Sequence, residues 1–194
     1  MMLHRTEPRT RGRIPALLIL LLGGLLTACG GNLTLDNPRN EGVTFTFDGD
    51  NTHSLGPGET ALIDLEPGLH SVEVRDAGGT VLADTNFRFA SHDEGIVHSG
   101  ESTYLVWRQL YGLQNERKTL LNERWVEFDS VRAYGDIKVY PASWLFVRKN
   151  WDLGLEEELP TSQTLYMTDD FKIEAKVFRA EDFIRTYKSM QRKE

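Results

Sequence analysis

The chain has 194 residues, of which 40% are hydrophobic and 26% charged, and its formal net charge is −7. This composition is that of a globular protein with room for one domain or two small ones. An acidic surface repels phosphates, so the charge argues against DNA or RNA as a partner.

The first 28 residues differ from the rest of the chain. Residues 1–13 carry four arginines and one glutamate, and an apolar run fills residues 14–26. A basic stretch followed by a short apolar run is typical of a secretory signal. Thirteen residues make a helix of about 20 Å, which is shorter than a hydrocarbon core of about 30 Å. The pattern therefore predicts a cleaved signal peptide over residues 1–28 rather than a permanent membrane span.

The run Leu26-Thr27-Ala28-Cys29 follows directly and resembles the lipobox of bacterial lipoproteins. The resemblance implies that a diacylglyceryl group alkylates the Cys29 thiol and that a peptidase cuts before this residue. Cys29 is the only cysteine, so it forms no internal disulfide, and lipidation accounts for its presence. The alternative is an ordinary signal peptide that is cut nearby and leaves the thiol free. We expect residues 29–32 to be the lipidated cysteine and a short tether.

Two or three acyl chains would hold the protein on a membrane, because each buried methylene contributes about 0.8 kcal/mol. In lipoproteins of enteric bacteria, aspartate after the cysteine favours the inner membrane. Gly30-Gly31-Asn32 stand here, which favours the outer membrane, with the protein facing the periplasm or the cell surface. Cleavage removes four Arg and one Glu, so the net charge changes from −7 to −10. A first strand that starts at Leu33 would lie within about 10 Å of the lipid.

Residues 33–90 consist of short segments with a strand pattern, separated by residues typical of turns. Val43-Thr44-Phe45-Thr46-Phe47 alternates strictly, and similar runs cover residues 60–65, 69–75, 81–84 and 86–89. Turn signals every 8–12 residues predict an antiparallel sheet, most simply a small sandwich. The segment 48–51 predicts a hairpin turn, and its carboxylates offer the alternative of a calcium site.

A family resemblance appears in the same segment. Gly56-Pro57-Gly58-Glu59, followed by residues 66–74 (Glu-Pro-Gly-Leu-His-Ser-Val-Glu-Val), resembles the PEGA and carboxypeptidase-regulatory-like modules of bacterial surface proteins. The Asn37-Pro38 opening is similar to that of envelope lipoproteins that begin with such a module. The resemblance covers roughly residues 33–90. It implies a compact, immunoglobulin-like β-sandwich with a scaffold role, and it carries over no catalytic residue.

The remainder predicts a loop and a second β-rich unit. Residues 91–102 are polar and contain glycine, so we expect a linker, and residues 103–194 form the second unit. Its strands are expected at 103–107, 125–128, 136–140, 144–147 and 171–178, with a short helix within 114–124. In the last strand, the alternation predicts that Lys172, Glu174 and Lys176 face water.

The period changes to a helical one at the C-terminus. Phe183, Ile184, Tyr187 and Met190 form a stripe with the spacing of a helix. We expect this helix to cover a sheet, and binding to a partner is the alternative.

The tryptophans are the main candidates for an interaction site. Trp107, Trp125, Trp144 and Trp151 could stack on sugars if they are exposed, or fill the core if they are buried. Residues 156–158 are three glutamates, which predict a solvated loop or a docking site for a basic partner.

Two other patterns in the sequence are candidates for a metal site or a catalytic site. His92, Asp93, Glu94 and His98 are the densest group of metal-ligand types, but they match no known zinc spacing, so a solvated loop is preferred. Residues 100–104 begin like a hydrolase nucleophile elbow, but Tyr104 stands where that turn requires glycine.

The sequence thus predicts a mainly β protein: a PEGA-like or immunoglobulin-like antiparallel sandwich, then a β-rich unit with a C-terminal helix. We expect no catalytic residue, no cofactor and no metal. The expected function is that of a lipid-anchored structural or protein-interaction module with another envelope protein as partner. A glycan-binding module that uses exposed tryptophans is the alternative, and an envelope hydrolase is the second alternative.

Overall fold

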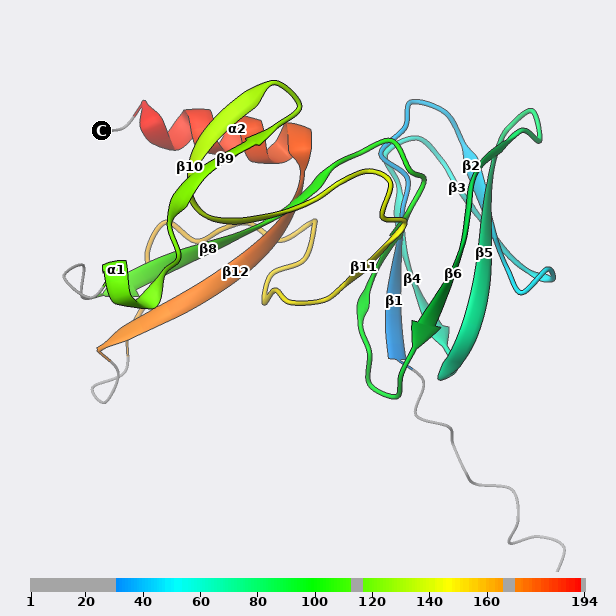
Figure 1. Cartoon of the computed structure of the whole chain (residues 1–194), viewed down its shortest axis with the longest axis horizontal. Helices are drawn as coiled ribbons and strands as arrows, with labels where there is room; N and C mark the ends of the chain where they lie inside the picture. Colours follow the sequence, from blue (N-terminus) through cyan, green and yellow to red (C-terminus); the bar gives the residue numbers. More distant parts are fainter. Residues whose placement is uncertain (1–30, 113–116, 166–169, 193–194) are drawn as a thin grey trace, which may run out of the picture.

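The computed structural model describes residues 31–112, 117–165 and 170–192, so the expected signal peptide and Cys29 lie outside the described residues. The described part of the chain forms twelve strands in three sheets and two helices, the longer of them at the C-terminus (Figure 1). The prediction of a mainly β protein with a C-terminal helix is therefore confirmed. No helix in these ranges has the length and apolarity to span a membrane.

Two four-stranded sheets pack face to face and make the N-terminal sandwich. One has the order β3 (Asn51–Leu55), β2 (Val43–Phe47), β5 (Gly68–Asp76) and β6 (Val81–Phe89). The other has the order β11 (Phe146–Arg148), β7 (Gly95–His98), β1 (Gly31–Asp36) and β4 (Thr60–Leu65). The alternation in β2 turns its valine and two phenylalanines inward, where they meet Leu33 and Leu35 of β1 in one apolar core.

Strand β7 corrects two predictions. Residues 95–98 were expected to lie in a loop, but they form a fully buried strand. This strand pairs with β1 in parallel and with β11 in antiparallel orientation, so the sandwich is not purely antiparallel. A strand buried on both faces does not alternate, and the two apolar residues Ile96 and Val97 are too short a run to mark such a strand in the sequence.

The third sheet has the order β12 (Phe171–Arg179), β8 (Tyr104–Gly112), β10 (Val131–Tyr140) and β9 (Arg124–Phe128). Helix α2 (Ala180–Gln191) covers one face of this sheet, as the stripe predicted, and Phe183 lies at the centre of the core between them. Strand β10 pairs with β9 up to Gly135 and with β8 from Asp136 onward. A side chain at Gly135 would place its Cβ 2.9 Å from the Trp107 ring nitrogen, so glycine lets β10 pass this indole.

The short helix expected within residues 114–124 is present, whereas the local prediction for β12 needs correction. Only Arg117–Leu120 are helical (α1) within the described part of the segment 114–124, and β9 already begins at Arg124. Glu174 and Lys176 were expected to face water, but both are buried. The Lys176 ammonium donates to the carbonyl oxygens of Gly154 at 2.6 Å and Leu155 at 3.1 Å, because the chain after β11 folds back over this strand.

Candidate functional site

The four tryptophans divide into two buried and two exposed residues. Trp107 and Trp151 are 6% and 8% exposed and belong to the cores on the two faces of the third sheet. Trp125 and Trp144 are 55% and 56% exposed. The structure therefore leaves Trp125 and Trp144 as candidates for binding and assigns Trp107 and Trp151 to packing.

Trp125 belongs to a cluster that we call the aromatic platform, formed by Trp125, Arg132 and Tyr134. Trp125 of β9 pairs directly with Tyr134 of β10, and their ring centroids are 5.4 Å apart. The Arg132 guanidinium lies 4.5 Å from the centre of the indole ring, which is cation–π geometry. Tyr134 is 45% exposed. Three large side chains thus form one solvent-facing patch.

The strand pattern explains why the aromatic platform faces outward. Val126, Phe128, Val131 and Ala133 alternate with the platform residues, and they pack in the core beneath α2. Side chains of successive strand residues point to opposite faces, so the platform residues must point away from α2. The Tyr187 hydroxyl of α2 also accepts a hydrogen bond of 2.9 Å from the Tyr134 amide. The platform therefore has a rigid base.

Trp144 belongs to a second site, which we call the junction cleft. This cleft has a volume of about 490 Å³ and lies between β6 and β11 of the sandwich and β10 of the third sheet. Its lining residues are Arg88, Lys138, Tyr140, Trp144, Phe146, Arg148, Lys149 and Asn150. Four of the eight are cations and three are aromatic, in a chain whose net charge is −7.

The cations of the junction cleft differ in their partners. Arg148 forms an ion pair of 3.0 Å with Asp93, and Lys149 pairs with Glu94. The Lys138 ammonium lies 4.7 Å from the centre of the Tyr140 ring. Within the described ranges, neither Arg88 nor Lys138 lies at ion-pair distance from a carboxylate. These two side chains give the cleft its excess positive charge.

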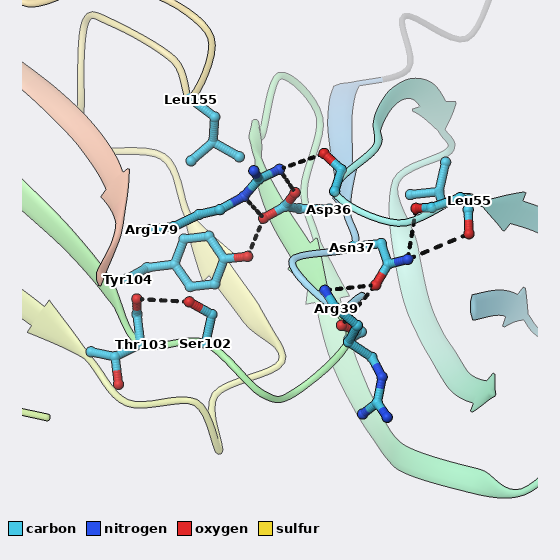
Figure 2. A network of polar contacts seen from close by, with 12 residues as sticks. Asp36, Asn37, Arg39, Leu55, Ser102, Thr103, Tyr104, Leu155 and Arg179 are labelled. Carbon is cyan, nitrogen blue, oxygen red and sulfur yellow. Dashed lines mark hydrogen bonds and ion pairs between the residues drawn. The ribbon is translucent and has the colours of Figure 1, made fainter. Parts of the chain in front are cut away.

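A buried polar network joins the sandwich to the third sheet (Figure 2). Asp36, the last residue of β1, is fully buried. Arg179, the last residue of β12, donates to its carboxylate from Nε at 3.0 Å and also from Nη2. The Tyr104 hydroxyl donates to the same carboxylate. The carboxylate raises the pKa of Arg179, and burial followed by the Asp36 charge raises the pKa of Tyr104.

His98 extends this network as a neutral side chain. Its ring lies against the Tyr104 ring, with the centroids 4.5 Å apart. Nδ1 accepts a hydrogen bond of 3.1 Å from the Gly100 amide, so Nε2 carries the proton and donates to the Trp144 carbonyl at 2.8 Å. Burial lowers the pKa of His98 to about 4. The same residue thus orders the segment that carries Trp144.

Asn37 organises the turns next to this network. Its side-chain nitrogen donates to the carbonyl oxygens of Gly56 at 2.7 Å and Glu41 at 2.8 Å, and its side-chain oxygen accepts from the Arg39 amide (Figure 2). The Asn37 side chain thus stabilises the turn that follows it, which gives a structural reason for asparagine before Pro38.

The remaining candidate residues of the sequence do not form a binding site among the described residues. The turn at 48–50 forms as predicted, and Asp48 accepts hydrogen bonds from the His70 ring at 2.7 Å and the Ser71 amide at 2.9 Å. His98 is buried away from the exposed His92, so the predicted group of ligand types does not converge. Across residues 31–112, 117–165 and 170–192, no three His, Cys, Asp or Glu side chains are placed to hold a metal ion. Glu156 and its two neighbours border a larger groove beside α2.

The buried pair Asp36 and Arg179 was not a candidate in the sequence. The two residues are 143 positions apart, and no local pattern marks either of them. A scan of known protein families found no match for this chain, and a search of curated proteins found none either.

Proposed function

We propose that the protein is a lipid-anchored, non-catalytic interaction module of a bacterial envelope, and that another envelope protein binds its aromatic platform. The anchor part of the proposal rests on Leu26-Thr27-Ala28-Cys29 and on Cys29 being the only cysteine. The partner part rests on one observation, the exposed stack of Trp125, Arg132 and Tyr134.

These three residue types are the ones that dominate binding energy at protein interfaces. Trp, Tyr and Arg are enriched among hot spots, because they bury a large area and lose little side-chain entropy on binding. The platform is already ordered by the cation–π contact and by the core beneath it, so association would cost little additional ordering. A rigid surface of this composition favours a protein partner.

The position of the platform suits a membrane-anchored protein. Figure 1 shows the β9–β10 hairpin at the upper end of the molecule and the beginning of β1 at the lower end. A lipid on Cys29 would therefore place the membrane on the side away from the platform.

The buried ionisable groups support a non-catalytic role. The polar side-chain atoms of Asp36, His98 and Tyr104 are all engaged in hydrogen bonds within the protein. Such a network fixes one arrangement of the two β-rich parts and uses its titratable groups for that purpose.

Photocrosslinking in intact cells tests the partner. A photoreactive phenylalanine analogue replaces Trp125 in one variant and Val81, which is also exposed, in the control variant. We expect a discrete protein adduct from position 125 that position 81 does not give. Arg132→Ala should lower the adduct yield about ten-fold, the effect of losing a contact of about 1.4 kcal/mol. The same adducts from positions 125 and 81 would contradict the proposal.

Fractionation tests the anchor. A Cys29→Ser variant should remain uncleaved at this position and lose the lipid-dependent mobility shift of the mature protein. Processing at the same place, together with retention in the membrane fraction without lipid, would contradict lipid anchoring.

Glycan binding is a second candidate, favoured by the neighbouring exposed rings of Trp125 and Tyr134. Two adjacent aromatic faces offer the apolar surface on which a sugar ring can stack. A neutral envelope glycan that changes the tryptophan fluorescence of the wild type, but not of Trp125→Phe, would favour this candidate over a protein partner.

A further inference from the structure

We propose that the junction cleft binds the acidic headgroup of a lipid in the membrane that holds the protein. This inference rests on the proposed lipid anchor at Cys29. The feature behind it is a cationic and aromatic cleft at β11, a strand of the same sheet as β1 that is separated from β1 by β7.

The beginning of β1 contacts Asp93, a residue that pairs with one of the cleft cations. A Cβ at Gly31 would clash with the carbonyl oxygen of Asp93, so the two backbones are in contact. The Asp93 side chain in turn forms the 3.0 Å ion pair with Arg148, which lines the cleft. Arg148 also donates to the carbonyl oxygen of Arg88 at 3.3 Å. One short chain of contacts therefore connects Gly31 to two cleft cations.

The covalent chain limits the distance from Gly31 to the lipid. Only Gly30 separates Cys29 from Gly31, and two Cα–Cα steps span at most about 7 Å. Cys29 sits at the membrane surface when it is lipidated, so Gly31 and the Asp93 backbone that it contacts lie close to the headgroups. The location of β1 thus selects a membrane lipid as the occupant over a soluble molecule.

The charge of the cleft complements an acidic headgroup. Asp93 and Glu94 offset Arg148 and Lys149, and the two cations without a carboxylate partner in the described part of the chain, Arg88 and Lys138, remain. The acidic surface elsewhere repels anionic lipids, but this repulsion is screened beyond about 8 Å at physiological salt. The local positive charge therefore determines whether an anionic headgroup binds in the cleft. The lipid anchor keeps the protein at the membrane despite the remaining repulsion.

Aromatic side chains add apolar surface to the cleft. Trp144 is half exposed and lies edge-on to the buried Tyr140, with their ring centroids 6.1 Å apart. His98 pairs with Asp36 and donates to the Trp144 carbonyl, so Trp144 lies near the Asp36 end of β1, away from Gly31. A volume of about 490 Å³ is in the range that accommodates a small polar headgroup.

Spin labels on the full lipidated protein test the proposal. Lipidation blocks the only native cysteine, so a new cysteine carries the only label. Asn150→Cys places the label in the cleft, and Ala77→Cys places it in the exposed turn between β5 and β6. The protein is reconstituted in vesicles of phosphatidylcholine alone, or of phosphatidylcholine with about a quarter of phosphatidylglycerol.

We expect the label at position 150 to become immobile and protected from a water-soluble relaxant only in the vesicles that contain phosphatidylglycerol, while the label at position 77 does not change. Each cation at an anionic surface favours the docked state about five-fold, so Arg88→Gln/Lys138→Gln should lower the docked-to-free ratio about 25-fold. The matched variant Arg185→Gln/Lys188→Gln removes two exposed cations elsewhere and should keep the wild-type ratio.

Three outcomes would overturn the inference. The first is an identical label signal at position 150 in both kinds of vesicle. The second is an equal loss of docking in the two double variants. The third is release of the docked state by soluble polygalacturonate, which would assign the cleft to an acidic saccharide. In each case the protein stays on the vesicle through Cys29, so the anchor and the aromatic platform are judged by their own experiments.

Discussion

Arg179 and Asp36 form a buried ion pair between the last residue of β12 and the last residue of β1. The guanidinium donates to the carboxylate from two nitrogens, and Arg179 Nη2 also reaches the Gly58 carbonyl at 3.2 Å. Because Asp36 belongs to the sandwich and Arg179 to the third sheet, this pair joins the two.

Removal of the buried carboxylate should destabilise the protein. Asp36→Asn leaves the largely buried guanidinium of Arg179 without its counter-charge, which costs about 3 kcal/mol in the free energy of unfolding. Urea denaturation measures this difference. Asp182→Asn is the control, because its pair with Arg185 is exposed and should contribute less than about 1 kcal/mol. Equal losses in the two variants would argue against a special role for the buried pair.

Tyr104→Phe tests the hydroxyl that donates to Asp36. The ring and its packing on His98 remain, and the carboxylate loses one donor, so we expect a loss of about 1–2 kcal/mol. Tyr134→Phe changes an exposed hydroxyl and should stay within about 0.5 kcal/mol of the wild type. If Tyr104→Phe had the same urea midpoint as the wild type, this hydrogen bond would make no net contribution to stability.

His98 should make the stability depend on pH in a defined window. Its pKa is about 4 in the folded protein and 6.5 when unperturbed, so the unfolded chain binds more protons between these values. Stability should therefore fall as the pH drops from 6.5 toward 4, by up to about 3 kcal/mol in total. Asp48, whose pKa is lowered below 3.8 by its hydrogen bond from His70, titrates outside this window.

The matched measurement is the same pH series on His98→Gln. This variant removes the titrating group, so its stability should change less between pH 6.5 and 4 than that of the wild type. Parallel curves for the two proteins would mean that another group causes the dependence.

Gly95→Ala tests how β11 attaches to the sandwich. A Cβ at Gly95 would lie 2.6 Å from the Val147 carbonyl oxygen and 2.7 Å from the Phe146 ring, so β11 would have to move. We expect a loss of about 1–3 kcal/mol and faster hydrogen exchange at Val147. Gly42→Ala is the control, because its Cβ would meet only the Leu55 carbonyl oxygen at an ordinary 3.5 Å. An unchanged exchange rate at Val147 would contradict the expected displacement.

The strands with local signals could be predicted from the sequence. The alternation in residues 43–47 and the change to a helical period at Phe183 are local, and both elements lie where the pattern indicates. Strand β7 could not be found in this way. Its four residues depend on pairing with β1 and β11, which lie far away in the sequence.

For the candidate site, the sequence predicted the type of residue but not which of these residues are exposed. The tryptophans were identified, but their burial depends on which sheet face α2 covers, and no local pattern states this. Trp107 points toward α2 and is buried, whereas Trp125 points away from α2 and is exposed. Lys176 is buried because carbonyl oxygens of Gly154 and Leu155 meet its ammonium group, a contact that alternation along β12 cannot anticipate.

The late position of β11 in the chain has a consequence for the order of folding. A polypeptide is made from its N-terminus, so β1 to β7 exist before the strand that borders β7 is available. Until residues 146–148 follow, the edge of β7 offers unpaired amides and carbonyls that another chain could pair with. A truncation after β7 should therefore aggregate instead of yielding a free sandwich, and the complete chain must fold as one cooperative unit.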